Sequence, residues 1–284
     1  MIYKLPLINQ SDVYDSDCNV LRSETCCGLM SLSLNTLRSL LYIHTNITSH
    51  PVTIEWINHF WNIQNRKEKN IFELYFKQNT REDDPVIMPH NTQLPHWYTF
   101  YDKIDYEPLK VLIAKYFDPD DKVKLQKKSF LEKYSINPKN TIGVLCRMTD
   151  KIFVVPSTPL SAYTTDIDKL SDANRILVQT DQQQMFDLFK GYYKDRCFKI
   201  EEIPTTTALT VMHHTSTKLI RDLSNYELGI RFLAVLSILS ECKYVVYNTC
   251  SPAYWINLLR GGVDGTCQYI PKIESVSHLD KPHC

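Results

Sequence analysis

Short apolar segments alternate with longer helical ones in the second half of the chain, and this alternation restricts the fold more than any other feature. Four segments have the length and apolar content of buried strands: 141–146, 174–180, 197–203 and 243–247. A long apolar helix is expected over 226–241. Strands that alternate with helices form parallel sheets with helices on both faces. We therefore predict an α/β fold with a doubly wound parallel sheet over 137–260.

Polar residues follow three of these strands, at the point where each strand ends. They are Arg147, Thr149, Asp150 and Lys151 after the first strand, Thr180 and Asp181 after the second, and Asn248, Thr249 and Ser251 after the fourth. The carboxyl ends of parallel strands share one edge of the sheet, and ligands of open α/β sheets bind beyond that edge. The sequence therefore predicts a binding site at this edge.

The residue types at this edge suit a diphosphate. Arg147 and Lys151 carry positive charge, and the planar fork of an arginine matches phosphate oxygens; Asp150 lies between the two cations and can hold either. Ser251 followed by Pro252 is a helix-start pattern with Ser251 as the N-cap, and helix N-termini bind phosphate groups. A salt-bridged strand end and a plain helix cap are the structural alternatives.

Residues 1–105 are expected to form a first α/β lobe. Its expected elements are a helix at 29–44, strands at 52–56 and 71–76, and an irregular loop at 80–100. The turn 23–28 precedes the helix, and the backbone N–H groups around Gly28 can cradle a ligand there.

Two helices separated at Asp118–Pro119–Asp120 are expected to link this lobe to the second one, over 106–136. Residues 137–284 are then expected to form a second, Rossmann-like lobe. A length of 284 residues suits two such lobes around a cleft.

Composition excludes several classes of function. Lys+Arg and Asp+Glu are balanced at 32 each, so nothing supplies the excess positive charge of a nonspecific nucleic-acid binder. The nine cysteines lack Cys-x-x-Cys spacing and are interpreted as reduced thiols. No signal sequence or membrane span is found. We expect a cytoplasmic enzyme, or a soluble fragment of an anchored one.

Motifs of other enzyme classes are absent from the sequence. It contains no Walker sequence, no Gly-x-Gly-x-x-Gly and no Gly-x-Ser-x-Gly, which disfavours P-loop kinases, NAD enzymes and α/β hydrolases. Asp-x-Asp occurs three times but never after an apolar strand, and His213-His214 has no further ligand at suitable spacing. No metal or cofactor is therefore expected, and His213 is a candidate contact for base, ribose or acceptor.

The segment 142–151, Ile-Gly-Val-Leu-Cys-Arg-Met-Thr-Asp-Lys, resembles the motif Val-Gly-Val-His-x-Arg-Arg-Thr-Asp-Lys of the α1,6-fucosyltransferase group, which includes the rhizobial nodulation fucosyltransferases. The apolar helix that leads to Leu-Ser-Glu-Cys, the next strand and Thr249-Cys250-Ser251 are similar to later elements of that group. Cys27-Gly28-Leu29 resembles its glycine-containing loop.

This resemblance implies a GT-B fold with two Rossmann-like lobes, 1–105 on the acceptor side and 137–284 on the nucleotide-sugar donor side. It also implies an inverting, metal-independent transfer of a sugar from a nucleotide-diphosphate sugar to a glycan hydroxyl. By resemblance, Arg147 contacts the β-phosphate and stabilises the leaving diphosphate, which matches electrostatic stabilisation where charge develops. By the same resemblance, Thr149, Asp150 and Lys151 position Arg147, and Ser251 contacts the phosphates or the ribose. The donor implied by default is GDP-fucose.

The sequence also departs from the motif. Leu145 replaces its histidine, Met148 replaces its second arginine, and Val235 stands where many members place a guanine-reading aspartate. A UDP-sugar such as UDP-xylose, used by a xylosyltransferase, is therefore an alternative donor, and a non-catalytic nucleotide-sugar-binding module is an alternative function. The candidates for the catalytic base are Glu24, Glu55, Glu73, His90, His96 and His213.

Overall fold

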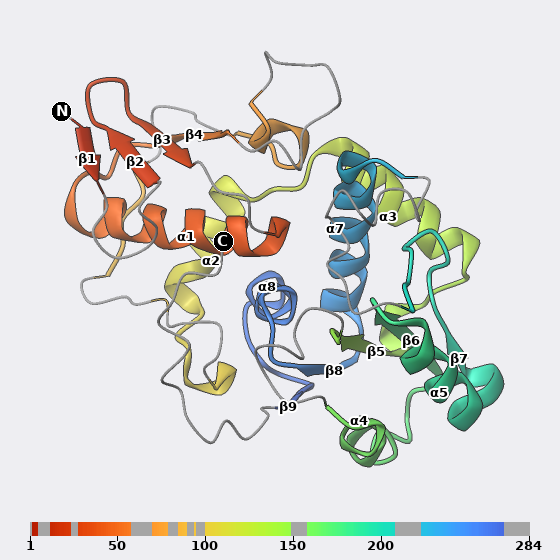
Figure 1. The fold of residues 1–284 in the computed structure, drawn as a ribbon. Helices are drawn as coiled ribbons and strands as arrows, with labels where there is room; N and C mark the ends of the chain where they lie inside the picture. The colour runs from red at the N-terminus through yellow and green to blue at the C-terminus, as the bar shows by residue number, and fades with distance from the viewer. Residues whose placement is uncertain are drawn as a thin grey trace.

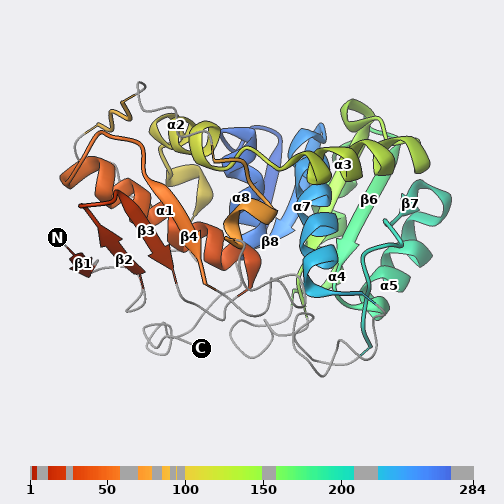
Figure 2. The ribbon, with the colours of Figure 1, turned by 90° about the horizontal axis from the view of Figure 1, so that it is seen from above.

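The computed structural model of the chain describes residues 2–4, 12–23, 28–57, 70–78, 85–89, 94, 100–148, 158–207 and 223–269. The chain forms two separate β-sheets, one from the first 60 residues and one from the second half of the chain. Helices α1, α8 and α7 lie between the sheets, with α8 in the middle (Figures 1 and 2).

The second sheet has five parallel strands in the order β7-β6-β5-β8-β9. Their bounds are Thr141–Cys146 for β5, Arg175–Thr180 for β6, Cys197–Phe198 for β7, Tyr244–Asn248 for β8 and Thr266–Tyr269 for β9. This confirms the predicted doubly wound parallel sheet. The third strand is shorter than predicted because a turn begins soon after Phe198, and β9 was not predicted.

Helices cover both faces of this sheet. They are α4 (Leu160–Ile167), α5 (Gln183–Tyr193), α7 (Asn225–Glu241) and α8 (Ser251–Arg260). Val144 of β5 packs with α4 and α5, whereas its neighbour Leu145 packs with α7 and α8. Gly143 brings α7 close to β5, since a Cβ there would lie 2.7 Å from Leu239 Cδ2. The connections therefore change face between β5 and β8, which is the topological switch point of the sheet.

The first sheet has the order β1-β2-β3-β4. Its strands are β1 (Ile2–Lys4), β2 (Asp12–Asp15), β3 (Val20–Ser23) and β4 (Thr53–Trp56). The first three are antiparallel, whereas β3 and β4 are parallel and are joined through α1 (Leu29–Asn46). The structure confirms the predicted helix and the strand at 52–56; β1 to β3 were not predicted.

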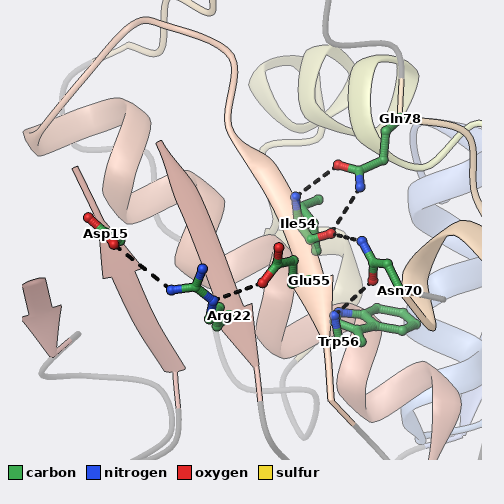
Figure 3. Close-up of polar contacts among 7 residues, drawn as sticks. All are labelled: Asp15, Arg22, Ile54, Glu55, Trp56, Asn70 and Gln78. Atoms are coloured by element: carbon green, nitrogen blue, oxygen red, sulfur yellow. Dashed lines mark hydrogen bonds and ion pairs between the residues drawn. The ribbon is translucent and has the colours of Figure 1, made fainter. Parts of the chain in front are cut away.

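Two amide side chains occupy the outer edge of β4 (Figure 3). Asn70 accepts a hydrogen bond from the Trp56 N–H (3.1 Å) and donates one to the Ile54 carbonyl. Gln78 accepts from the Ile54 N–H (2.8 Å) and donates to the same carbonyl (3.0 Å). The prediction of a strand at 71–76 is wrong: a 3₁₀ turn, Phe72–Leu74, lies there, and side chains satisfy the edge that a further strand would have paired.

The segment 106–136 forms α2 (Glu107–Tyr116) and α3 (Asp121–Lys133), as predicted, with Asp120 capping α3. Shorter 3₁₀ turns lie at Tyr101–Lys103, Pro138–Asn140 and Lys194–Arg196. The ring of Phe117, just after α2, packs on Trp255 of α8 and on Phe76. One continuous apolar core therefore extends from the first sheet through α2, α8 and α7 to the second sheet. The predicted domain boundaries stay a prediction.

No helix in the described ranges is both long enough and apolar enough to cross a membrane. The six cysteines that the structure describes are free thiols, most of them buried.

We predict that Asn70→Ala lowers the free energy of unfolding by about 2 kcal/mol, because it leaves the Trp56 N–H without its acceptor and the Ile54 carbonyl with Gln78 as its one remaining side-chain donor. Urea denaturation followed by circular dichroism measures the change. Asn46→Ala is the control, since Asn46 is an exposed residue whose side chain donates a hydrogen bond to the Tyr42 carbonyl, and its loss should cost about 0.5 kcal/mol or less. An equal loss in both variants would contradict the role of Asn70.

His44 joins α1 to α2, and its stabilising effect should depend on pH. Its Nε2 lies 2.8 Å from the Tyr116 hydroxyl, and burial lowers its pKa from 6.5 to about 4. Between these two values the unfolded chain binds the proton and the folded chain does not, so stability falls as pH falls. We predict that the stability advantage of wild type over His44→Gln shrinks from pH 6.5 to pH 4, by at most about 1.4 kcal/mol per unit. Urea midpoints at each pH measure it, and a constant difference would contradict the prediction.

Candidate functional site

The ends of β5 and β8 meet at the topological switch point, where Asn248 holds the main chain of Arg147. The Asn248 Oδ1 accepts a hydrogen bond from the Arg147 N–H (3.0 Å), and its Nδ2 donates to the Arg147 carbonyl (2.8 Å). Asn248 is only 2 % exposed. This two-point bond between neighbouring strands fixes where the Arg147 side chain leaves the sheet edge.

Asp181, at the end of β6, holds the other side of the same segment. Its Oδ1 accepts a hydrogen bond from the Met148 N–H (2.9 Å), and its Oδ2 forms an ion pair with the Arg147 Nε at 3.1 Å. The side chains are 5 % exposed for Asp181 and 19 % for Arg147. Asp181 therefore orients the guanidinium and offsets part of the cost of its burial, a role that the sequence suggested for Asp150.

Other predicted donor-binding side chains at this edge are buried against the protein. The Thr249 hydroxyl donates to the Tyr269 carbonyl (3.1 Å) and accepts from Gln268 Nε2 (3.0 Å). The Thr180 hydroxyl accepts from the Gln182 N–H (3.2 Å). These bonds connect the edge to β9 and to the start of α5, so both threonines shape the site through neighbouring main chain.

The N-termini of α1 and α8 meet at the same edge. The Ser31 and Ser251 hydroxyl oxygens lie 3.1 Å apart, in the first turns of the two helices. The N-cap residues are Gly28 and Cys250, and neither helix has a side-chain cap or an acidic residue in its first turn. Two positive helix ends therefore point at one region.

The prediction that Ser251 is the N-cap of α8 is wrong by one residue. Ser251 is already helical, and its hydroxyl is directed at Ser31 rather than at its own helix. The Tyr101 hydroxyl instead contacts the main chain of the actual cap, donating to the Cys250 carbonyl (3.1 Å) and accepting from its N–H (3.3 Å). The Leu29 side chain is buried in the core, so a ligand can meet this residue through its backbone alone.

Several predicted site residues lie outside the described residues: Thr149, Asp150, Lys151, His213 and, among the candidate bases, Glu24, His90 and His96. Glu55 lies on the face of the first sheet that is turned away from α1, paired with Arg22 at 2.8 Å, and Arg22 lies between it and Asp15 (Figure 3). Glu73 accepts a hydrogen bond from Gln78 beside the edge of β4. Neither glutamate is placed among the residues around Arg147.

The described part of the chain contains no group of three or more His, Cys, Asp or Glu side chains that could hold a metal ion.

Sequence reasoning missed Ser31 and Tyr101 at this site. The signal for Ser31 is its place in the first turn of a helix that starts after Gly28. Tyr101 gave no signal, because its contact with Cys250 joins residues 149 positions apart.

Comparison with known proteins finds similarity in structure alone. No protein-family model matches the chain, and no curated protein matches its sequence. Among solved structures, NodZ α1,6-fucosyltransferase soaked with GDP-fucose matches with a TM-score of 0.53 at 14 % identity, over 84 % of this chain and 91 % of that one. NodZ from Bradyrhizobium matches with a TM-score of 0.50 at 14 % identity, over 84 % and 92 %.

An Arabidopsis thaliana FUT1 variant in complex with GDP matches with a TM-score of 0.52 at 11 % identity, over 91 % of this chain and 72 % of that one. The likeness that the segment 142–151 indicated is therefore confirmed at the level of the fold. The chain has the two-lobed GT-B fold of these fucosyltransferases.

Proposed function

We propose that the chain is a glycosyltransferase that moves a sugar from a nucleotide-diphosphate sugar to a hydroxyl group of a glycan. The observation that carries this proposal is the placement of Arg147 at the switch point of the parallel sheet, where Asn248 fixes its main chain and Asp181 its guanidinium. The GT-B fold, shared with fucosyltransferases solved with GDP-fucose and GDP, supports the same assignment.

The reaction that we propose is an inverting displacement. The acceptor hydroxyl attacks the anomeric carbon from the face opposite to the diphosphate, while the bond from that carbon to the β-phosphate oxygen breaks. The hydroxyl proton passes to a base, and the nucleoside diphosphate leaves with the bonding electrons. Negative charge therefore grows on the β-phosphate during the step, and a cation fixed beside it stabilises the transition state more than the ground state.

We assign Arg147 as this cation, and the N-termini of α1 and α8 add positive potential to it. Because Asn248 and Asp181 hold Arg147 through bonds within the protein, its charge is oriented by the fold itself. The proposal therefore assigns charge neutralisation to protein groups, which corresponds to a metal-independent transferase. Lys151, Thr149 and Asp150 keep their proposed role around Arg147.

GDP-fucose is the donor that we propose, with a UDP-sugar as the alternative. The similar structures that contain GDP-fucose or GDP favour the first. Val235, which is fully buried in α7, favours the alternative, because its apolar side chain cannot read guanine.

A second candidate function is binding of a nucleotide sugar without transfer. The ion pair between Arg147 and the buried Asp181 favours it, because part of the arginine's charge is already neutralised. Both candidate functions require binding of a nucleotide sugar, but only the first includes transfer of the sugar.

We predict that Arg147→Lys lowers the rate of sugar transfer by about 100-fold, because lysine keeps the charge but loses the planar fork of donors. Arg147→Ala should lower it further. The measurement is release of nucleoside diphosphate in the presence of a panel of glycan acceptors. Arg196→Lys is the matched control, since Arg196 bonds main-chain carbonyls just before β6, at the amino edge of the same sheet. Wild-type turnover in both Arg147 variants would exclude the assigned role.

We predict that GDP-fucose raises the melting temperature of the wild-type chain more than UDP-xylose does, because a ligand that binds the native state stabilises it. Thermal shift at matched ligand concentrations measures this, and Arg147→Ala should lose most of the shift. A larger effect of UDP-xylose would reassign the donor. Binding without any transfer would select the second candidate function.

A further inference from the structure

One stripe of α1 is left partly open while the rest of the helix is buried. Between Leu29 and Asn46, the residues that are not buried recur at intervals of three and four: Ser31, Asn35, Arg38, Tyr42 and Thr45. Residues at this spacing lie on one face of a helix. The first three are polar, and Ser31 contacts α8. The stripe therefore begins at the two helix N-termini of the candidate site.

A matching polar face of α8 lies against it. Ser251 and Tyr254 are three residues apart, on one face of the helix, and both are buried. Ser251 contacts Ser31, and Tyr254 interacts electrostatically with Arg38. We call these four residues the α1–α8 seam; α1 and α8 lie side by side in both ribbon views (Figures 1 and 2).

The Tyr254 hydroxyl is an unused hydrogen-bonding group in this seam. Its side chain is 0 % exposed, and the oxygen has no hydrogen-bond partner among the residues that the structure describes. Helical side chains lean toward the N-terminus of their helix, and the Tyr254 ring stacks on Tyr101, which contacts the N-cap of α8. The hydroxyl lies near enough to Arg38 of α1 to interact with it electrostatically. Burying it without a partner costs roughly 1–3 kcal/mol, which a bound acceptor atom would offset.

Arg38 brings a cation to the same place. Its Nη1 donates to the Asn35 Oδ1 at 3.3 Å, so the side chain runs back along α1 toward Ser31. Burial lowers the pKa of Arg38, and arginine stays charged at neutral pH. A cation that has lost much of its water attracts an anion more strongly than an exposed one.

The seam is connected to Arg147 through Asn248. Asn248, which holds Arg147, is three residues before Ser251, and three consecutive Cα steps span at most about 11 Å. Arg147 is already paired with Asp181, so a diphosphate brings more negative charge than Arg147 neutralises.

We propose that the α1–α8 seam is a second anion-binding subsite, in which Arg38 and the Tyr254 hydroxyl take phosphate oxygens of the nucleotide diphosphate beside Ser31 and Ser251. The proposal rests on the proposed function and deepens it, because it assigns binding groups from the first lobe as well as from the second.

Tyr254→Phe is the informative variant, since it keeps the ring that packs on Tyr101 and removes one oxygen. Removing a buried hydroxyl without a partner should leave the melting temperature of the ligand-free chain unchanged or raise it. The same change should weaken binding of GDP or UDP, and of inorganic pyrophosphate, by about tenfold, because a hydrogen bond to a charged group is lost. Arg38→Gln should weaken both by about tenfold or more.

Calorimetric titration of the full chain with GDP, UDP and inorganic pyrophosphate tests the proposal. Tyr163→Phe is the matched control: it removes another buried tyrosine hydroxyl, from α4 on the opposite face of the sheet, and should leave all affinities unchanged. Weaker binding in Tyr254→Phe and Arg38→Gln, with the control unchanged, supports the subsite.

The outcomes separate this proposal from the proposed function. If wild type binds a nucleoside diphosphate and both seam variants bind it equally well, the subsite is overturned and the proposed function stands. If wild type binds pyrophosphate but neither GDP nor UDP, and the seam variants bind pyrophosphate more weakly, the anion subsite stands and the proposed function is overturned. If wild type binds none of the three ligands, both are overturned.

Discussion

The burial of α8 between the two lobes is the constraint on which the rest of the architecture depends. Trp255 packs on Phe117 after α2, and Tyr254 stacks on Tyr101. On the other side, Asn257 donates a hydrogen bond to the Tyr247 hydroxyl of β8 at 2.7 Å. Because these contacts hold α8 from both lobes, they position its N-terminus relative to α1 and to the end of β5. The candidate site is assembled by that position.

Charge at the site is positioned by contacts within the protein. Arg147 has an internal partner in Asp181, and Asn248 is committed to the Arg147 main chain. A buried cation with a carboxylate partner is cheaper to fold than an unpaired one, but its attraction for a ligand is reduced. The N-termini of α1 and α8 also supply positive potential. Neither helix has a side-chain cap or an acidic residue in its first turn that would offset this potential. Fixed dipoles and a restrained arginine therefore share the task of binding an anion.

The sequence predicts the parts of this fold whose signal is local. The apolar runs of β5, β6 and β8 are strong strand signals, and the helical spacing of apolar residues in α1 and α7 is a strong helix signal. The polar residues that follow the strands locate the edge of the sheet at which the site lies. Short polar strands such as β2, with the sequence Asp-Val-Tyr-Asp, give no such signal. The segment 71–76 has strand composition, but Asn70 and Gln78 already fill the neighbouring edge, which residue types alone do not reveal.

The limits at the candidate site are of the same kind. Arg147, Asp181 and Asn248 can be predicted as neighbours from their positions after parallel strands. The separate roles of Asp181 and Asn248 cannot be predicted, because they depend on which side-chain oxygen accepts from which N–H group. Ser31 and Ser251 are 220 residues apart, and no spacing rule connects them.

The side-chain caps on β4 also bear on how copies of this chain behave in a crowded solution. An uncovered strand edge offers a row of N–H and carbonyl groups on which another molecule can add a strand, and this is a common start of aggregation. Asn70 and Gln78 occupy those groups at Ile54 and Trp56 with their own amides. The first sheet is thereby closed on this side to intermolecular strand addition, without a further strand of its own.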